Sequence, residues 1–336
     1  MFISGSTELA RMNAMQSRTN AIQNDLVRVG KELSSGLKTD LYEASGGNKA
    51  KLYAIERALD RNDAFSRNIT VSEQRLTIAQ NSLEVIQLAA EDLSVDMLAA
   101  AGSAPVAQLE LHADEARIDF ANAVSMLNSQ ANGATIFGGM AVSSVAMEKG
   151  ETILAELDTL VAGAPDAATA IGLIETYFDA AGPGDYYTNA YLGSDQNMAE
   201  IELAEGDRLD FGIRGDTPEV VAMLQAYAIS AVVAGGLFAG DSANIKAMMG
   251  ESGEQMLSAK QGVLNLRAQV GTQQEQIEDA KSRNTAERTT LELTRLGHIG
   301  KDETESAAEF KALEAQLDAA FIVTARLASI SFTNYM

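Results

Sequence analysis

Few residues of this 336-residue chain could do chemistry, and their spacing assembles no catalytic set. The chain has no Cys and only two His, His112 and His298. It therefore lacks a thiol nucleophile, and it also lacks the closely spaced histidines that are typical of a zinc site. His112 lies beside an apolar helical stripe, and we interpret it as a solvated or partly packed side chain. We expect no enzyme activity, no catalytic residue, no cofactor and no metal site.

A glycine-rich stretch is the other motif that could indicate ligand binding. Gly235, Gly236 and Gly240 superficially resemble a nucleotide-binding fingerprint. That fingerprint follows a β-strand, whereas these glycines follow an Ala-rich helical stretch with a different spacing. We therefore do not expect a nucleotide site here.

Composition narrows the classes of partner. A net charge of -22 argues against nucleic-acid binding, which needs clustered Lys and Arg, while 46% apolar content is enough for real cores. The start of the chain shows no basic segment followed by an apolar one, so we expect no cleaved signal peptide. The longest small and apolar run, 229–240, is too short to cross a bilayer. We expect neither nucleic acid nor membrane as a partner, and any export would need another route.

A long helix dominates the sequence pattern. Between Asn48 and Ala101 there is no Gly or Pro, and every third or fourth residue from Ile55 to Ala100 forms a heptad seam. This pattern predicts one helix of roughly 70 Å, at about 1.5 Å per residue, which needs long partner helices. Heptad spacing recurs at 109–127 and 263–291, which we expect to be those partners. The polar seam residues Asn62 and Ser72 either fix the register within the chain or face a neighbouring subunit.

The two ends of the chain match each other in pattern. A heptad seam near the start ends at about Gly36, and a second one follows a break at 297–300, where Asp302 or Thr304 could cap the final helix. Isolated helices of this length are marginal in water, so we expect them to pair antiparallel and to be ordered by assembly. The predicted assembly seams are Met15, Ile22, Leu26, Val29, Leu33, Phe310, Leu313, Leu317 and Leu327.

The middle of the chain differs in composition. Residues 134–250 hold four basic against 17 acidic side chains, a net of -13. We expect short helices at 152–161 and 167–178, and a hairpin of 199–204 with 208–213. A further helix should run from Thr217 and Pro218 to about Phe238. The predicted fold is mainly α, a long antiparallel helical rod with an inserted acidic α+β domain. The predicted domains are 1–45 with 300–336, 46–133 with 251–299, and 134–250.

Three strings carry a resemblance to a known family. The string ELSSGLK at 32–38, the following DLYEASGGNKAKLYAIERAL, and the closing LEAQLDAAFIVTARLASISFTNYM resemble the flagellin family of bacterial axial proteins. The resemblance covers roughly the first 130 and the last 85 residues. It implies flagellin-like terminal and rod helices, and a structural subunit of the extracellular flagellum.

The segments 128–148 and 205–227 look most like the hook-filament junction branch of the family, hook-associated protein 3. The resemblance then implies hook-associated protein 1 and flagellin as partners, together with copies of the chain in a ring. It also implies type III export in an unfolded state and a cytosolic export chaperone. A filament flagellin is the alternative, because some flagellins carry related inserts. A third hypothesis is ligand binding or enzymatic activity in the acidic insert, for example with Ca²⁺, although no ligand cage is visible.

Overall fold

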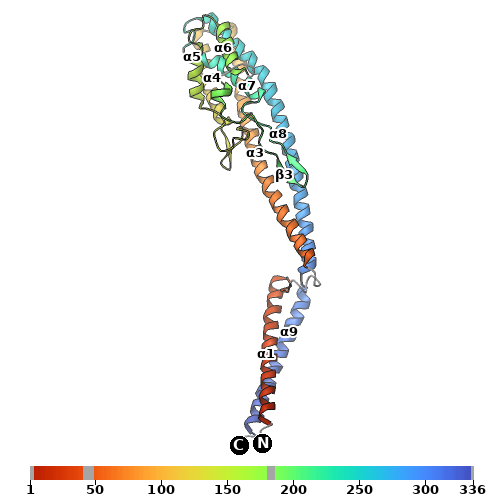
Figure 1. Cartoon of the computed structure of the whole chain (residues 1–336). Coiled ribbons are helices and arrows are strands. Elements are labelled where there is room, and N and C mark those ends of the chain that lie inside the picture. The colour runs from red at the N-terminus through yellow and green to blue at the C-terminus, as the bar shows by residue number, and fades with distance from the viewer. Residues whose placement is uncertain (1–3, 41–48, 180–185, 334–336) are drawn as a thin grey trace. The chain divides into compact units, whose positions relative to one another are not determined.

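The computed structural model describes residues 4–40, 49–179 and 186–333, with side chains described from 10 to 326 (Figure 1). It confirms a mainly α protein. The chain divides into two compact units, which we call the terminal unit, Met1–Asp63 with Thr285–Met336, and the central unit, Ala64–Asn284. The three-part domain division expected from the sequence stays a prediction.

The predicted long helix is confirmed as α3 (Ala50–Ser103), and its heptad seam is buried from Ile69 to Ala100. Asn62 in the terminal unit and Ser72 in the central unit are both buried, so these polar seam residues face the interior of the chain. The partner helix is α8 (Ser242–Ile299). It begins well before the heptad pattern at 263–291, because the Asp241 carboxylate accepts hydrogen bonds from the first helical N–H groups.

Ion pairs between α3 and α8 fix their direction in the central unit. The α3 partners are acids and the α8 partners are bases, and the α8 residue number falls as the α3 number rises. The helices therefore run antiparallel. Close approach is possible at Gly253, where an added Cβ would lie 2.9 Å from Leu98 Cγ. The pairs are Glu73–Lys281 at 3.0 Å, Glu84–Arg267 at 3.3 Å and Glu91–Lys260 at 2.6 Å.

The described part of the central unit also holds the shorter helices α4 (Val106–Leu127), α5 (Gly150–Val161), α6 (Ala167–Phe178) and α7 (Pro218–Ala234). Helix α7 is buried along most of its length and packs against α4, α5 and α6. The hydrophobic cluster of this unit includes residues of α3, α4 and α8 as well as of the inserted helices and strands. The insert therefore shares its core with the long helices.

Helix α3 continues through Ser103, and the N-cap residue of α4 is Pro105, which has no side-chain hydrogen bond. One boundary prediction was wrong. Helix α7 ends at Ala234 rather than near Phe238, whose φ of 58° is left-handed. Thr217 occupies the N-cap position, but its hydroxyl donates to the Arg214 carbonyl at 3.0 Å and does not cap the helix.

Within the described residues the strands form two antiparallel hairpins, β1 (Gln130–Ala131) with β2 (Ala134–Thr135) and β3 (Ile201–Ala204) with β4 (Asp207–Leu209). A π-helical turn, η1 (Tyr186–Ala190), lies between them in the chain. The second hairpin confirms the prediction in shorter form. Side-chain amides of Asn68 and Gln276 donate to carbonyl groups of its strands, and that of Gln273 donates to the Asp210 carbonyl just after β4. Hydrogen bonds from α3 and α8 therefore cover this short sheet on both edges.

The terminal unit holds α1 (Ser4–Ser35), α9 (Glu303–Thr333) and the adjoining ends of α3 and α8, where Arg288 pairs with Asp63. Within the ranges that the structure describes, no helix is both long and apolar enough to cross a membrane.

Candidate functional site

The paired terminal helices α1 and α9 are the candidate functional site. Gly36, with a φ of 68°, ends α1 in a conformation that favours glycine. The Lys38 N–H then donates to the Ile299 carbonyl at 2.8 Å, and the Lys301 N–H donates to the Gly36 carbonyl at 2.9 Å. This bridge joins the end of α1 to the start of α9, so the two helices lie side by side and antiparallel (Figure 1).

The predicted seam residues face this interface to different degrees. Ile22 and Val29 are buried, at 8% and 0% exposure. Phe310 packs over Gly30, where an added Cβ would lie 3.3 Å from the ring. Leu327 lies in α9, but its side chain is outside the described residues. The half-buried seam members are Met15, Leu26, Leu33, Phe310, Leu313 and Leu317. The structure thus brings the two seams together, while their role in assembly stays a prediction.

Pairing leaves apolar surface uncovered on both helices. The exposed large apolar residues of the pair include Met12 and Val27 on α1 and Phe321, Ile322 and Val323 on α9. Large exposed apolar patches are rare on soluble monomeric proteins, and those that occur often mark interaction sites.

A buried carboxylate fixes the register of the pair. The Glu32 side chain is 4% exposed, and it accepts hydrogen bonds from the Thr39 N–H at 2.9 Å and the Lys301 ammonium at 3.2 Å. Arg28 approaches the same carboxylate to 3.5 Å. Lys301 also donates to Glu309 of α9 at 2.7 Å. These contacts connect the last turns of α1 to the first turns of α9.

The pKa values of Glu32 and Lys301 shift in the directions that favour an ion pair. Burial alone would raise the pKa of Glu32, but the hydrogen bonds from Thr39 and Lys301 and the charges of Lys301 and Arg28 hold it below its ordinary value. The pKa of Lys301 is raised, chiefly by its hydrogen bond to Glu309 and further by Glu32. Both groups are therefore charged at neutral pH.

Sequence reasoning missed the Glu32–Lys301 pair, although Glu32 opens one of the family-like strings. A Glu and a Lys that are 269 positions apart give no local signal that they meet. The predicted cap at Asp302 is confirmed, because its carboxylate accepts from the Thr304 N–H at 2.7 Å and from the Glu305 N–H at 3.1 Å. Thr304, the other candidate cap, donates its backbone N–H in this turn and is therefore capped by Asp302.

The other candidate residues do not form a catalytic site. His112 is partly packed, with its Nδ1 atom 3.6 Å from a carboxylate oxygen of Glu115. The described residues contain no group of three or more His, Asp or Glu that could hold a metal ion. Gly235, Gly236 and Gly240 follow α7, so the structure does not place them after a strand.

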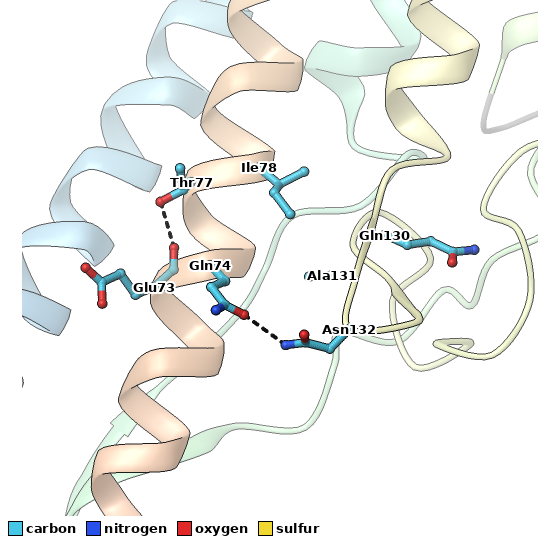
Figure 2. A pocket seen from close by; sticks show the side chains of 7 residues that line it. All are labelled: Glu73, Gln74, Thr77, Ile78, Gln130, Ala131 and Asn132. Carbon is cyan, nitrogen blue, oxygen red and sulfur yellow. Dashed lines mark hydrogen bonds between the residues drawn. The ribbon is translucent and has the colours of Figure 1, made fainter.

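An open pocket of about 430 Å³ lies between α3 and the β1–β2 hairpin, as Figure 2 shows. Gln74 of α3 accepts a hydrogen bond from the Asn132 amide at 2.9 Å, and Asn132 and Gly133 form the left-handed turn of the hairpin. The Asn-Gly dipeptide was the sequence signal for this hairpin, which we did not predict. Glu73, the acid of the pocket, is already paired with Lys281. The lining residues therefore supply no nucleophile with an adjacent base.

Comparisons with known proteins support the fold. No protein-family model matches the sequence, and no curated protein sequence is significantly similar to it. The structure is similar to that of FlgL from Bacillus cereus, with a TM-score of 0.51, 16% identity, and coverage of 73% of this chain and 100% of that chain. It is also similar to a flagellar hook-associated protein from Vibrio parahaemolyticus, with a TM-score of 0.50, 13% identity, and coverage of 73% and 94%. The chain has the fold of these flagellar proteins.

Proposed function

We propose that the chain is a structural subunit of the bacterial flagellum that joins hook-associated protein 1 to the flagellin filament. The observation that carries the proposal is the fold, which matches FlgL over the whole of that solved chain. The strings at 32–59 and 313–336, similar to the flagellin family, support it independently. In this function the protein is not an enzyme.

The terminal helix pair supports an assembly role. Antiparallel pairing of α1 and α9 covers Ile22 and Val29 but leaves apolar side chains exposed on both helices. Burying an apolar side chain completely stabilises by about 1.5–3 kcal/mol. Neighbouring copies in a ring would supply this burial, and so would hook-associated protein 1 and flagellin. Export in an unfolded state, with a cytosolic chaperone on the C-terminal helix, is part of the same proposal and places the protein outside the cell.

Electron microscopy of a strain that lacks the gene tests this function. We expect cells with complete hooks and no attached filaments, and restoration of filaments by the wild-type gene. A second complementing gene that encodes the chain without α9 should fail to restore them. Normal filaments in the deletion strain would contradict the proposal.

The runner-up is a filament flagellin, which the resemblance of the terminal strings also fits. It predicts that purified protein added to filament seeds grows into long fibres. A junction subunit should instead bind to seed ends without elongating them. Electron microscopy of the seeded reaction separates the two functions.

A further inference from the structure

A second pocket of the central unit has an unusual lining. It has a volume of about 450 Å³ and lies between α3, the loop that contains Met140, and the segment that leads into β3. Its apolar lining is Met140, Val142, Met198 and Ile201, and Met140 is 59% exposed. Glu200 and Glu202 also line it and are exposed. We call it the Arg75 pocket, after the cation that lines it from α3.

The guanidinium group of Arg75 lacks a full set of hydrogen-bond partners. Its Nε atom is buried and has no hydrogen-bond partner, and one of its terminal N–H groups donates to the Met198 sulfur, a weak acceptor. Among the described residues no carboxylate forms an ion pair with Arg75. Burial lowers its pKa, the direction expected for a cation that has lost water without gaining a carboxylate partner. A half-buried guanidinium of this kind is available for a ligand.

The lining selects an aromatic ring over a carboxylate as the ligand. A guanidinium plane stacks on an aromatic face, and methionine sulfur atoms make favourable contacts with aromatic rings. An incoming carboxylate would be repelled by Glu200 and Glu202 at the same pocket. A basic flank on the ligand, by contrast, would be attracted by Glu202, and also by Glu200, which lies 3.5 Å from Arg208.

The chain itself carries a ring of this kind. Tyr53 of α3, in the terminal unit, is 54% exposed. Arg57 lies four residues after it and therefore on the same side of the helix, with Glu56 beside it, and Lys49 lies in the turn just before α3. Phe321 of α9 is the other exposed large aromatic residue among those described, but its nearest charged neighbour is the acid Asp318. Charge therefore favours Tyr53 over Phe321.

We propose that the Arg75 pocket binds the Tyr53 ring of a second copy of the chain. The phenol hydroxyl could donate to Glu200 or Glu202, and the ring would lie against Arg75, Met140 and Met198. Because every copy carries both the ring and the pocket, the contact can repeat from copy to copy. The inference rests on the proposed function only in that both require the chain to assemble with itself.

Cysteine cross-linking tests this contact directly, because the natural chain has no Cys. Full-length Tyr53→Cys protein is mixed with full-length Met140→Cys protein under oxidising conditions, at a concentration where the wild type associates. We expect a disulfide-linked dimer of the two variants. Tyr53→Cys mixed with Ile118→Cys, an exposed position on α4, is the matched control and should give only background. A mixed dimer no more abundant than in this control would overturn the proposal.

Sedimentation of non-cysteine variants gives a second readout. Tyr53→Ala and Arg75→Gln should each weaken self-association about tenfold, and the double variant should be no weaker than either one. Tyr53→Phe should retain association, because the ring is kept, and Arg67→Gln on α3 is the control for loss of an exposed arginine. Circular dichroism identifies any variant that fails to fold, and Met140→Ala, which alters an exposed side chain, then replaces Arg75→Gln.

Two results would exclude Tyr53 as the ligand. One is a wild type that stays monomeric at the highest soluble concentration, and the other is additive effects of the two substitutions. If either occurs while the deletion strain still lacks filaments, the junction function stands and only this contact is wrong. If the contact is found but the deletion strain has normal filaments, the contact stands and the junction function is wrong.

Discussion

The two units of the chain use the same heptad pattern but differ in how completely it is buried. In the central unit the α3 seam from Ile69 to Ala100 is buried against α8, α4 and the inserted elements. In the terminal unit only Ile22 and Val29 of the α1 seam are buried, and α9 offers half-buried partners. A two-helix pair cannot enclose its seam, whereas three or more packed elements can. The comparison indicates that the seam of the central unit is enclosed within one chain, whereas the seam of the terminal pair has surface left for neighbours.

The two units should therefore differ in local stability. In dilute protein, amide hydrogen exchange should be fastest in α1 and α9 and slowest in the buried parts of α3, α4 and α7. Protease should cut the ends first. Exchange protection in α1 and α9 equal to that of α7 would show that the seams are already satisfied within one chain.

The largest effect is expected in the central core. Phe120 of α4 is fully buried, so Phe120→Ala should lower the free energy of unfolding by about 3–5 kcal/mol through lost burial and the cavity left behind. Urea denaturation followed by circular dichroism measures this change. Ile118→Ala, two residues earlier and 62% exposed, is the matched control and should change stability by less than about 0.5 kcal/mol. Similar losses in both variants would contradict the described burial of α4.

The next largest effect belongs to the buried carboxylate of the terminal pair. Glu32→Gln keeps the shape of the side chain but removes the charge that Lys301 and Thr39 contact, which should cost about 2 kcal/mol locally. Amide exchange should accelerate in α1 and α9 and stay unchanged in α7. Glu314→Gln, at an exposed position of α9, is the control. Acceleration across all helices would instead indicate that the two units unfold together.

The same residue predicts a pH dependence. Because the pKa of Glu32 is lowered on folding from an ordinary value of 4.5, its stabilisation is complete above that pH and is lost as the pH falls through the folded-state pKa. The Lys301 contribution has the opposite pH dependence. Because its pKa is raised on folding, its stabilisation is complete below the ordinary value of 10.5 and is lost as the pH rises through the folded-state pKa. The protection of the α1 amides, measured relative to the intrinsic exchange rate at each pH, should therefore fall on acidification below pH 4.5 in the wild type, and less so in Glu32→Gln. Equal acid sensitivity in both proteins would exclude Glu32 as the cause.

A smaller effect is expected from the seam itself. Val29→Ala should destabilise the terminal pair by about 1 kcal/mol, because part of the lost burial is offset by the better helix propensity of Ala. Val27→Ala on the same helix is the matched control, since Val27 is 57% exposed and Val29 is fully buried. Amide exchange in α9 measures the difference. If Val27→Ala accelerates exchange in α9 of the monomer more than Val29→Ala does, the two helices are not paired through this seam.

The smallest effect is expected at the cap of α9. Asp302→Ala removes the acceptor for the Thr304 and Glu305 N–H groups, whose hydrogen bonds also lower the pKa of Asp302. Exchange should accelerate in the first turn of α9 only. Thr304→Ala is the control and should leave that turn protected.

Much of the fold could be predicted because its signals are local. Heptad spacing predicted α1, α3, α4 and α9, and the exact bounds of α6 agree with its pattern and with the Asp166 cap, whose carboxylate accepts from the Thr169 N–H at 2.9 Å. The predicted helix boundaries were wrong where the local signals were weak. Helix α7 ends at Ala234 before the expected Phe238, and the start of α8 depended on Asp241.

The candidate site was predictable only in part. The seam residues follow from periodicity alone, because one face of a helix must be buried. The Glu32–Lys301 pair and the Arg75 pocket depend on residues that are far apart in the sequence, and charged residues carry no pattern that identifies a distant partner. Sequence similarity to the flagellin family identified the string that contains Glu32 without indicating its burial.

By itself the sequence determined which segments are helical and which face of each is apolar, because these properties depend on neighbours three and four residues away. It also determined that the chain has no thiol chemistry and that residues 134–250 form an acidic segment. Only the tertiary structure decided that Asn62 and Ser72 face the interior, that the insert shares its core with α3 and α8, and that Glu32 is buried beside Lys301. Burial and ion pairing depend on which surfaces meet, and for these residues the meeting partners are separated by most of the chain.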